Sequence, residues 1–63
     1  MLEIGWHLRH TNASRVDVLV QGRHREECHE VLRLEPYWRV EEGDAEDLPP
    51  GAARFIYRRL RGR

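Results

Sequence analysis

Residues 16–20 form the most continuous hydrophobic run of the chain, because Asp17 is the only polar residue among three valines and Leu19. Valine is enriched in β-strands, and the run contains neither glycine nor proline, so the segment predicts a strand. A run that is almost entirely apolar is typical of a strand covered on both faces. We therefore expect this strand to lie at the centre of the fold, with Val18 buried.

Residues 2–9 alternate strictly between hydrophobic side chains, among them Trp6, and polar side chains or glycine. A period of two predicts a half-buried strand that places Trp6 in the core. Asn12 and Ser14, in the cluster that follows, favour a turn. This strand, the turn and the strand at residues 16–20 together predict a β-hairpin.

The hydrophobic period lengthens over residues 23–34, as expected for an amphipathic helix. Pro36 disfavours the helical conformation at Glu35, so the helix should end before this residue. A helix in this position would cover the apolar face of the hairpin. The residues that share its apolar face are His24, Cys28, Val31 and Leu32.

Residues 37–42 predict a third strand, because Trp38 and Val40 alternate with polar or amphipathic side chains. We expect Trp38 and Val40 to face the core. The side chains expected to face outward from this strand are Tyr37, Arg39 and Glu41.

Residues 43–51 are acidic and contain consecutive prolines, which predicts a loop. The next segment, residues 52–61, allows two interpretations. As a helix, it has Asp47 as a possible N-terminal cap, and the arginines of its last turn suit the helix dipole. As a strand, residues 53–59 alternate poorly, because Ile56 falls on the same side as the arginines. We favour the helix and keep a fourth strand as the alternative.

These elements define an α+β fold in which residues 1–63 form a single small domain. The predicted order is β-β-α-β-α, with a three-stranded, largely antiparallel sheet and the helices packed on it. If residues 53–59 form a fourth strand instead, the order becomes β-β-α-β-β.

The chain has 63 residues, and a domain of this size buries only roughly 60% of the surface that its unfolded chain exposes. Cys28 is the only cysteine, which excludes a disulfide within the chain and suggests a reducing, cytoplasmic setting. No stretch approaches the roughly 20 apolar residues of a membrane span. Because so small a core benefits from further burial between subunits, we expect a homodimer.

Eleven basic residues balance eleven acidic residues, so the net charge favours neither a nucleic-acid partner nor an acidic tail. Their distribution is uneven: residues 26–47 hold nine carboxylates and two arginines, whereas residues 52–63 hold five arginines and no acidic side chain. All eleven basic residues are arginine, which a GC-rich bacterial or phage genome would explain. Arginine donates bidentate hydrogen bonds and stacks on aromatic planes, which suits it to binding.

The sequence holds few groups of residues that could catalyse a reaction or bind a metal ion. His24 and Cys28 share a helical face and are weak candidates for a metal site, since structural zinc needs four ligands. No CxxC motif, HExxH motif or glycine-rich phosphate loop is present. A nucleophile–base pair would require Cys28 to lie near a histidine that is distant in sequence. We therefore expect neither enzymatic activity nor a cofactor.

Two hypotheses for binding follow. The first is an accessory or regulatory module that binds protein, because the acidic middle and the arginine-rich end are complementary and aromatic residues and arginine are enriched at interface hot spots. The alternative is a module that binds nucleic acid through its C-terminal arginines, against which the nearby carboxylates argue. The residues expected to contact nucleic acid or a partner are Tyr37, Arg39, Arg54, Arg58, Arg59 and Arg61.

Overall fold

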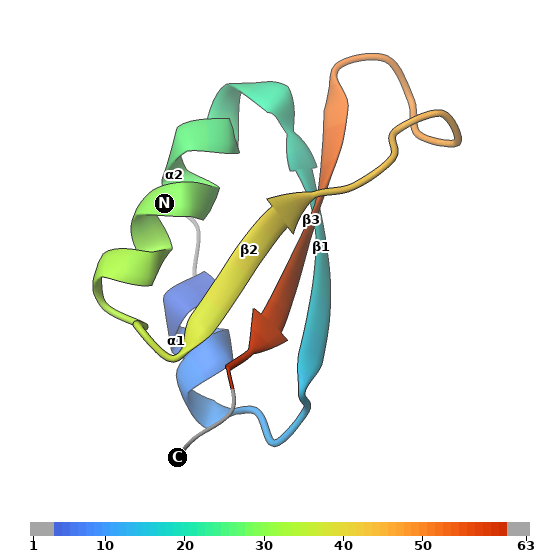
Figure 1. Cartoon of the computed structure of the whole chain (residues 1–63). Coiled ribbons are helices and arrows are strands. Elements are labelled where there is room, and N and C mark those ends of the chain that lie inside the picture. The colour runs from blue at the N-terminus through green and yellow to red at the C-terminus, as the bar shows by residue number, and fades with distance from the viewer. Residues whose placement is uncertain (1–3, 61–63) are drawn as a thin grey trace.

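A computed structural model describes residues 4–60, and its three strands form one antiparallel sheet (Figure 1). Both α-helices lie on the same side of this sheet (Figure 1). The α+β class and the antiparallel three-stranded sheet predicted from the sequence are thus confirmed. In chain order, the elements are α1 (Ile4–His10), β1 (Arg15–Gln21), the 3-10 helix η1 (Gly22–His24), α2 (Arg25–Glu30), the 3-10 helix η2 (Val31–Arg33), β2 (Trp38–Glu42) and β3 (Ala52–Arg59).

The centre of the sheet is β3, which pairs with β1 on one side and β2 on the other. Phe55 and Tyr57 of β3 have no exposed surface, whereas the valines of β1 are only half-buried. The other face of β1 is exposed, at Asp17 and Leu19. The prediction that residues 16–20 form a central strand covered on both faces was therefore wrong in its position, although the strand itself is present.

The segment after the acidic loop is a strand, so the helix favoured for residues 52–61 was wrong and the alternative strand was correct. Burial alternates along this segment, as expected for a strand. Ala53, Phe55 and Tyr57 are buried against the helices, and the residues between them face the other side. Ile56, which weakened this pattern in the sequence, lies between the two outer strands on the uncovered face.

The predicted first strand is a helix, and the predicted hairpin of residues 2–9 with residues 16–20 is absent from residues 4–60. Ile4 and Leu8, one helical turn apart, are buried, whereas Trp6 is 61% exposed and lies outside the core. The interpretation failed because residues separated by four positions share a face in a strand and in a helix alike. The hairpin of this fold joins β2 to β3 instead.

The middle of the chain agrees with the prediction. Residues 22–33 form η1, α2 and η2 in succession, and the helical segment ends before Glu35. Cys28 is fully buried against the sheet, where its carbonyl oxygen accepts a hydrogen bond of 2.6 Å from the Tyr57 hydroxyl. Trp38 of β2 is buried as predicted. The core therefore lies between the helices and one face of the sheet.

Candidate interaction surface on the open face of the sheet

One face of the sheet points away from the helices (Figure 1). Its side chains come from alternate positions of all three strands, which the register sets in rows across the sheet. The rows are Arg15, Arg58 and Arg39, then Asp17, Ile56 and Glu41, then Leu19 and Arg54.

Arginines of three strands form the first row, because Arg58 of β3 is directly opposite both Arg15 and Arg39. Like charges at directly opposite positions repel each other. The second row offsets part of this repulsion: Arg15 Nε donates to Asp17 Oδ1 at 2.8 Å, and Arg58 Nη2 lies 3.4 Å from Glu41 Oε2. Rows of opposite charge thus alternate along the strands.

Two arginines of this face lower the pKa of a carboxyl group with which they form an ion pair. The hydrogen bond from Arg15 holds the pKa of Asp17 below its ordinary value. Arg54 donates to Asp47 Oδ2 at 2.9 Å and to the Asp44 carbonyl at 3.0 Å, and its hydrogen bond lowers the pKa of Asp47. Asp47, considered above as a helix cap, instead links the acidic loop to β3 through its ion pair with Arg54.

Arg39 differs from the other arginines of this face, because its side chain forms no ion pair or hydrogen bond with another residue between 4 and 60. Tyr37 precedes it by two positions and is 68% exposed. The Tyr37 carbonyl accepts the Leu60 N–H at 2.8 Å, which extends the ladder between β2 and β3 past the arginine row. An exposed tyrosine therefore lies next to a cationic row.

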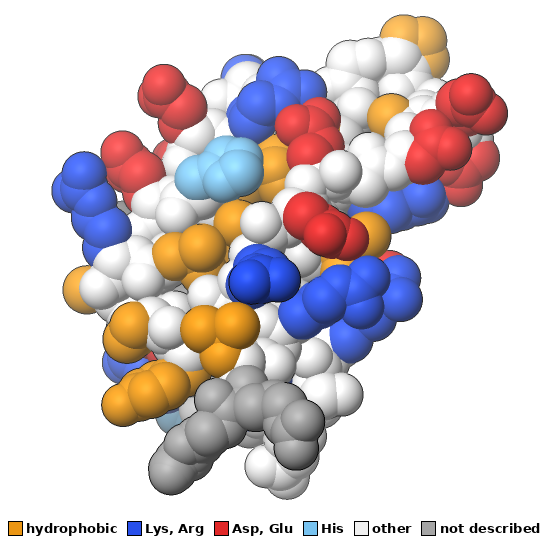
Figure 2. Space-filling model, viewed as in Figure 1, with side chains coloured by type: hydrophobic (Ala, Val, Ile, Leu, Met, Phe, Trp, Pro, Cys, Tyr) orange, Lys and Arg blue, Asp and Glu red, His pale blue; other side chains and the backbone are white. Residues whose placement is uncertain are grey.

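Arginine and carboxylate side chains are interspersed over the strands, and hydrophobic side chains gather over the connection from α2 to β2 (Figure 2). This connection contains the exposed residues Leu34 and Tyr37. The surface is therefore a mosaic of both charges beside exposed apolar groups, rather than a field of one sign.

Arg59 has a different environment from the other predicted binding residues. Its guanidinium carbon lies 4.5 Å from the ring centroid of Trp38. Its Nη2 also donates to the carbonyls of Thr11 and Ala13, at 2.8 and 3.2 Å. Arg59 therefore holds the loop between α1 and β1 against the end of the sheet. Arg61 lies outside the described residues.

His24 and Cys28, the weak candidates for a metal site, gain no further ligand from residues 4–60. The described part of the chain contains no cluster of three or more His, Cys, Asp or Glu side chains suited to a metal ion. His24 hydrogen-bonds to Glu27 through Nδ1, and Cys28 is buried in the core, where burial raises the pKa of its thiol.

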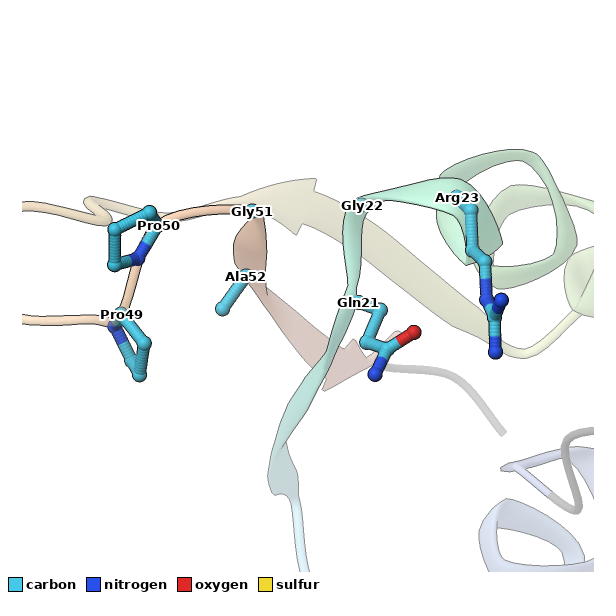
Figure 3. A pocket seen from close by; sticks show the side chains of 7 residues that line it. All are labelled: Gln21, Gly22, Arg23, Pro49, Pro50, Gly51 and Ala52. Atoms are coloured by element: carbon cyan, nitrogen blue, oxygen red, sulfur yellow. The ribbon is translucent and has the colours of Figure 1, made fainter.

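A shallow pocket lies where β1 and β3 meet the acidic loop (Figure 3). Between two of its lining residues, the Gly22 N–H donates to the Gly51 carbonyl at 2.6 Å, and Gly51 has a positive φ of 86°. Its walls are mainly proline, glycine and alanine, and the polar side chains are Gln21 and Arg23. Neither is a general base or a nucleophile, so this pocket offers no grouping typical of an active site.

Comparison with protein-family models, with curated proteins and with solved structures finds no match to this chain. None of the helices between residues 4 and 60 is long and apolar enough to cross a membrane.

The structure brings Arg39, Arg54 and Arg58 to one face, together with Arg15 and Asp17, which sequence reasoning left out. The sequence does not show the register between β1 and β3. Alternation indicates that Arg15 and Asp17 share a face, but only the pairing with β3 places them beside Arg58. Tyr37 lies at the margin of the same surface.

Proposed function

We propose that this protein is a small, non-catalytic interaction module that forms a homodimer and acts as an accessory or regulatory protein by binding other proteins. The observation that carries the proposal is the uncovered sheet face, whose charged rows alternate in sign around the apolar side chains of Ile56 and Leu19. A cytoplasmic setting belongs to the same proposal, because the single thiol is buried and no disulfide supports the fold.

The ion pairs of the open face favour a protein partner over a polyanion. Arg15, Arg54 and Arg58 each already contact a carboxylate of the same chain. A polyanion would have to displace these carboxylates, whereas a partner of mixed charge can add to the pattern. Exposed Trp6, Leu34 and Tyr37 provide apolar area of the kind enriched at protein interfaces.

Sedimentation velocity over a wide range of protein concentration tests the self-association. We expect the weight-average mass to rise from that of one chain towards that of two, with a midpoint at micromolar concentrations. A single monomeric species at all concentrations up to about 100 μM, which corresponds to a binding free energy weaker than about −5.5 kcal/mol, would contradict the homodimer.

Nucleic-acid binding is the second candidate, and the row of Arg15, Arg58 and Arg39 next to Tyr37 is the observation that favours it. Arginines contact phosphates and tyrosine stacks on bases in proteins that bind single strands. This candidate predicts that RNA or DNA binding weakens steeply with salt, and weakens further in the variant Arg39→Ala plus Arg58→Ala. Arg33→Ala, which removes an exposed arginine of η2, is the matched control. Absence of binding at low salt would eliminate this candidate.

A further inference from the structure

Within residues 4–60, the outer edge of β1 is free, because β1 pairs with β3 on one side only. At both ends of this ladder, the residues of β1 that bond β3 are even-numbered: Arg59 N–H donates to the Ser14 carbonyl, and Gly22 N–H to the Gly51 carbonyl. Bonded and non-bonded pairs alternate along an antiparallel ladder. The backbone groups that point to the free edge therefore belong to Arg15, Asp17, Leu19 and Gln21.

Among the features by which native sheets prevent pairing with another strand, residues 15–21 of this edge have charged side chains, at Arg15 and Asp17, and no others. Its seven residues follow a continuous register without a bulge and include no proline, glycine or lysine. The one carboxylate, Asp17, is paired with Arg15. Within residues 4–60, no backbone–backbone hydrogen bond from outside β3 reaches residues 15–21.

Hydrophobic surface lies exposed on both sides of the same edge. A groove beside it is lined by Ile4 and His7 of α1 together with residues 16–20. The three valines of β1 are only half-buried, and Leu19 on the opposite face is 60% exposed. A strand added at this edge would cover both surfaces.

The other edge of the sheet, along β2, is less available. Its bonds to β3 involve odd-numbered residues, since Gly43 N–H donates to the Arg54 carbonyl and Leu60 N–H to the Tyr37 carbonyl. Of the three residues that face outward, Trp38 already donates its N–H to the Glu35 carbonyl at 3.3 Å. The edge of β1 is longer and, among the described backbone groups, carries no such bond.

We infer that the occupant of this edge is a second copy of the chain, whose β1 adds antiparallel to the first. Two three-stranded sheets then become one continuous sheet of six strands, with the helices on one face and the arginine rows on the other. This inference rests on the proposed homodimer and specifies where the two chains meet.

The register follows from the residues of β1. A two-fold axis beside Val18 pairs all seven residues of the strand, sets the valines opposite one another, and places Asp17 opposite Leu19 of the partner subunit. The edge-facing residues then form the hydrogen-bonded pairs, as their orientation requires. Moving the axis to Asp17 would set two carboxylates opposite each other, and moving it to Leu19 would leave part of the strand unpaired.

Proline substitution distinguishes dimerisation through the β1 edge from dimerisation through the β2 edge. Leu19→Pro removes an N–H that faces the free edge of β1, whereas Val40→Pro removes one that faces the free edge of β2. Neither change removes a bond to β3, and proline is tolerated at such edge positions. In sedimentation velocity, Leu19→Pro is expected to be monomeric at concentrations where the unaltered chain and Val40→Pro are dimeric. Folding of each variant is checked by circular dichroism.

A folded Leu19→Pro variant that dimerises as tightly as the unaltered chain would overturn the inference and leave the proposed homodimer standing. A monomeric unaltered chain would instead refute the homodimer itself. These two failures are therefore distinguishable in one set of measurements.

Disulfide trapping tests the register and does not depend on folding of the proline variant. In a non-hydrogen-bonded pair the Cα atoms are about 4.5 Å apart, within the range that a disulfide spans. Val18→Cys is expected to form a covalent dimer under mild oxidation, while Val16→Cys is not, because the two copies of that position lie roughly 13 Å apart along the strands. Native Cys28 is buried and does not compete. Equal trapping of both variants, or of neither, would contradict the register.

Discussion

At the scale of single residues, the two largest fully buried side chains belong to β3. Phe55 and Tyr57 are fully buried, and the Tyr57 hydroxyl is bonded to the Cys28 carbonyl beneath α2. Burial raises the pKa of Tyr57 well above its ordinary value, so the hydroxyl remains protonated and keeps its donor role throughout the physiological range. Val18, by contrast, is half-buried in an edge strand.

This difference predicts unequal costs of truncation. Phe55→Ala should lower the free energy of unfolding by about 3–5 kcal/mol, because it opens a cavity between the sheet and the helices. Val18→Ala should cost about 1 kcal/mol, because water already reaches part of the side chain. Urea denaturation measures both values. A Val18→Ala cost equal to or greater than that of Phe55→Ala would contradict the central position of β3.

At the scale of elements, ion pairs add to the contacts of the hydrophobic core. Arg25 of α2 donates to both carboxylate oxygens of Glu42 at the end of β2, at 3.0 and 2.9 Å. Arg54 fastens the acidic loop through Asp47. Hydrogen bonds from these arginines lower the pKa of Glu42 and of Asp47.

These lowered pKa values predict a loss of stability in acid. A carboxyl group with a lower pKa in the folded chain than in the unfolded chain stabilises the fold above its unfolded pKa of about 4 and loses this contribution as the pH falls through the folded value. The melting temperature should therefore fall below about pH 4. The fall should be smaller in a variant with Glu42→Gln and Asp47→Asn. An identical pH profile in that variant would show that these pairs contribute nothing.

The hydrophobic pattern predicted the correct element where it fitted only a helix or only a strand. It failed where the pattern fitted both. The strand at residues 16–20 and the helical segment before Pro36 were predictable, because their patterns allow one interpretation each. In α1, the spacing of Ile4 and Leu8 fits a strand and a helix equally. In residues 52–59, capping and dipole preferences favoured a helix, but pairing on both sides favours the strand, and such long-range contacts are not visible in local sequence.

The candidate surface was predictable only in part for the same reason. The sequence identified Arg39, Arg54 and Arg58 as candidate binding residues. Their arrangement in a row with Arg15 depends on the order β1-β3-β2, in which the last strand lies between the other two. Local pattern predicts which side of a strand a residue occupies, and only the tertiary pairing determines which residues become its neighbours.

At the scale of the whole molecule, residues 4–60 form a sheet covered by helices on one face and open on the other, and the outer edge of β1 has no pairing partner among these residues. A core on one side only limits the stability that a chain of this size can reach. Pairing at the β1 edge would enlarge the apolar core under the sheet and double the open face. The proposed homodimer would therefore also enlarge the proposed binding surface.

Amide hydrogen exchange resolved by residue in NMR spectra tests directly whether two chains pair at the β1 edge. The amides of Val18 and Val20, which bond β3, should be protected at every concentration. The amides of Asp17 and Leu19 should be protected only where the chain is dimeric, and their exchange should accelerate on dilution. Exchange of Asp17 and Leu19 at unprotected rates in a concentrated sample, with Val18 protected, would contradict pairing at the β1 edge.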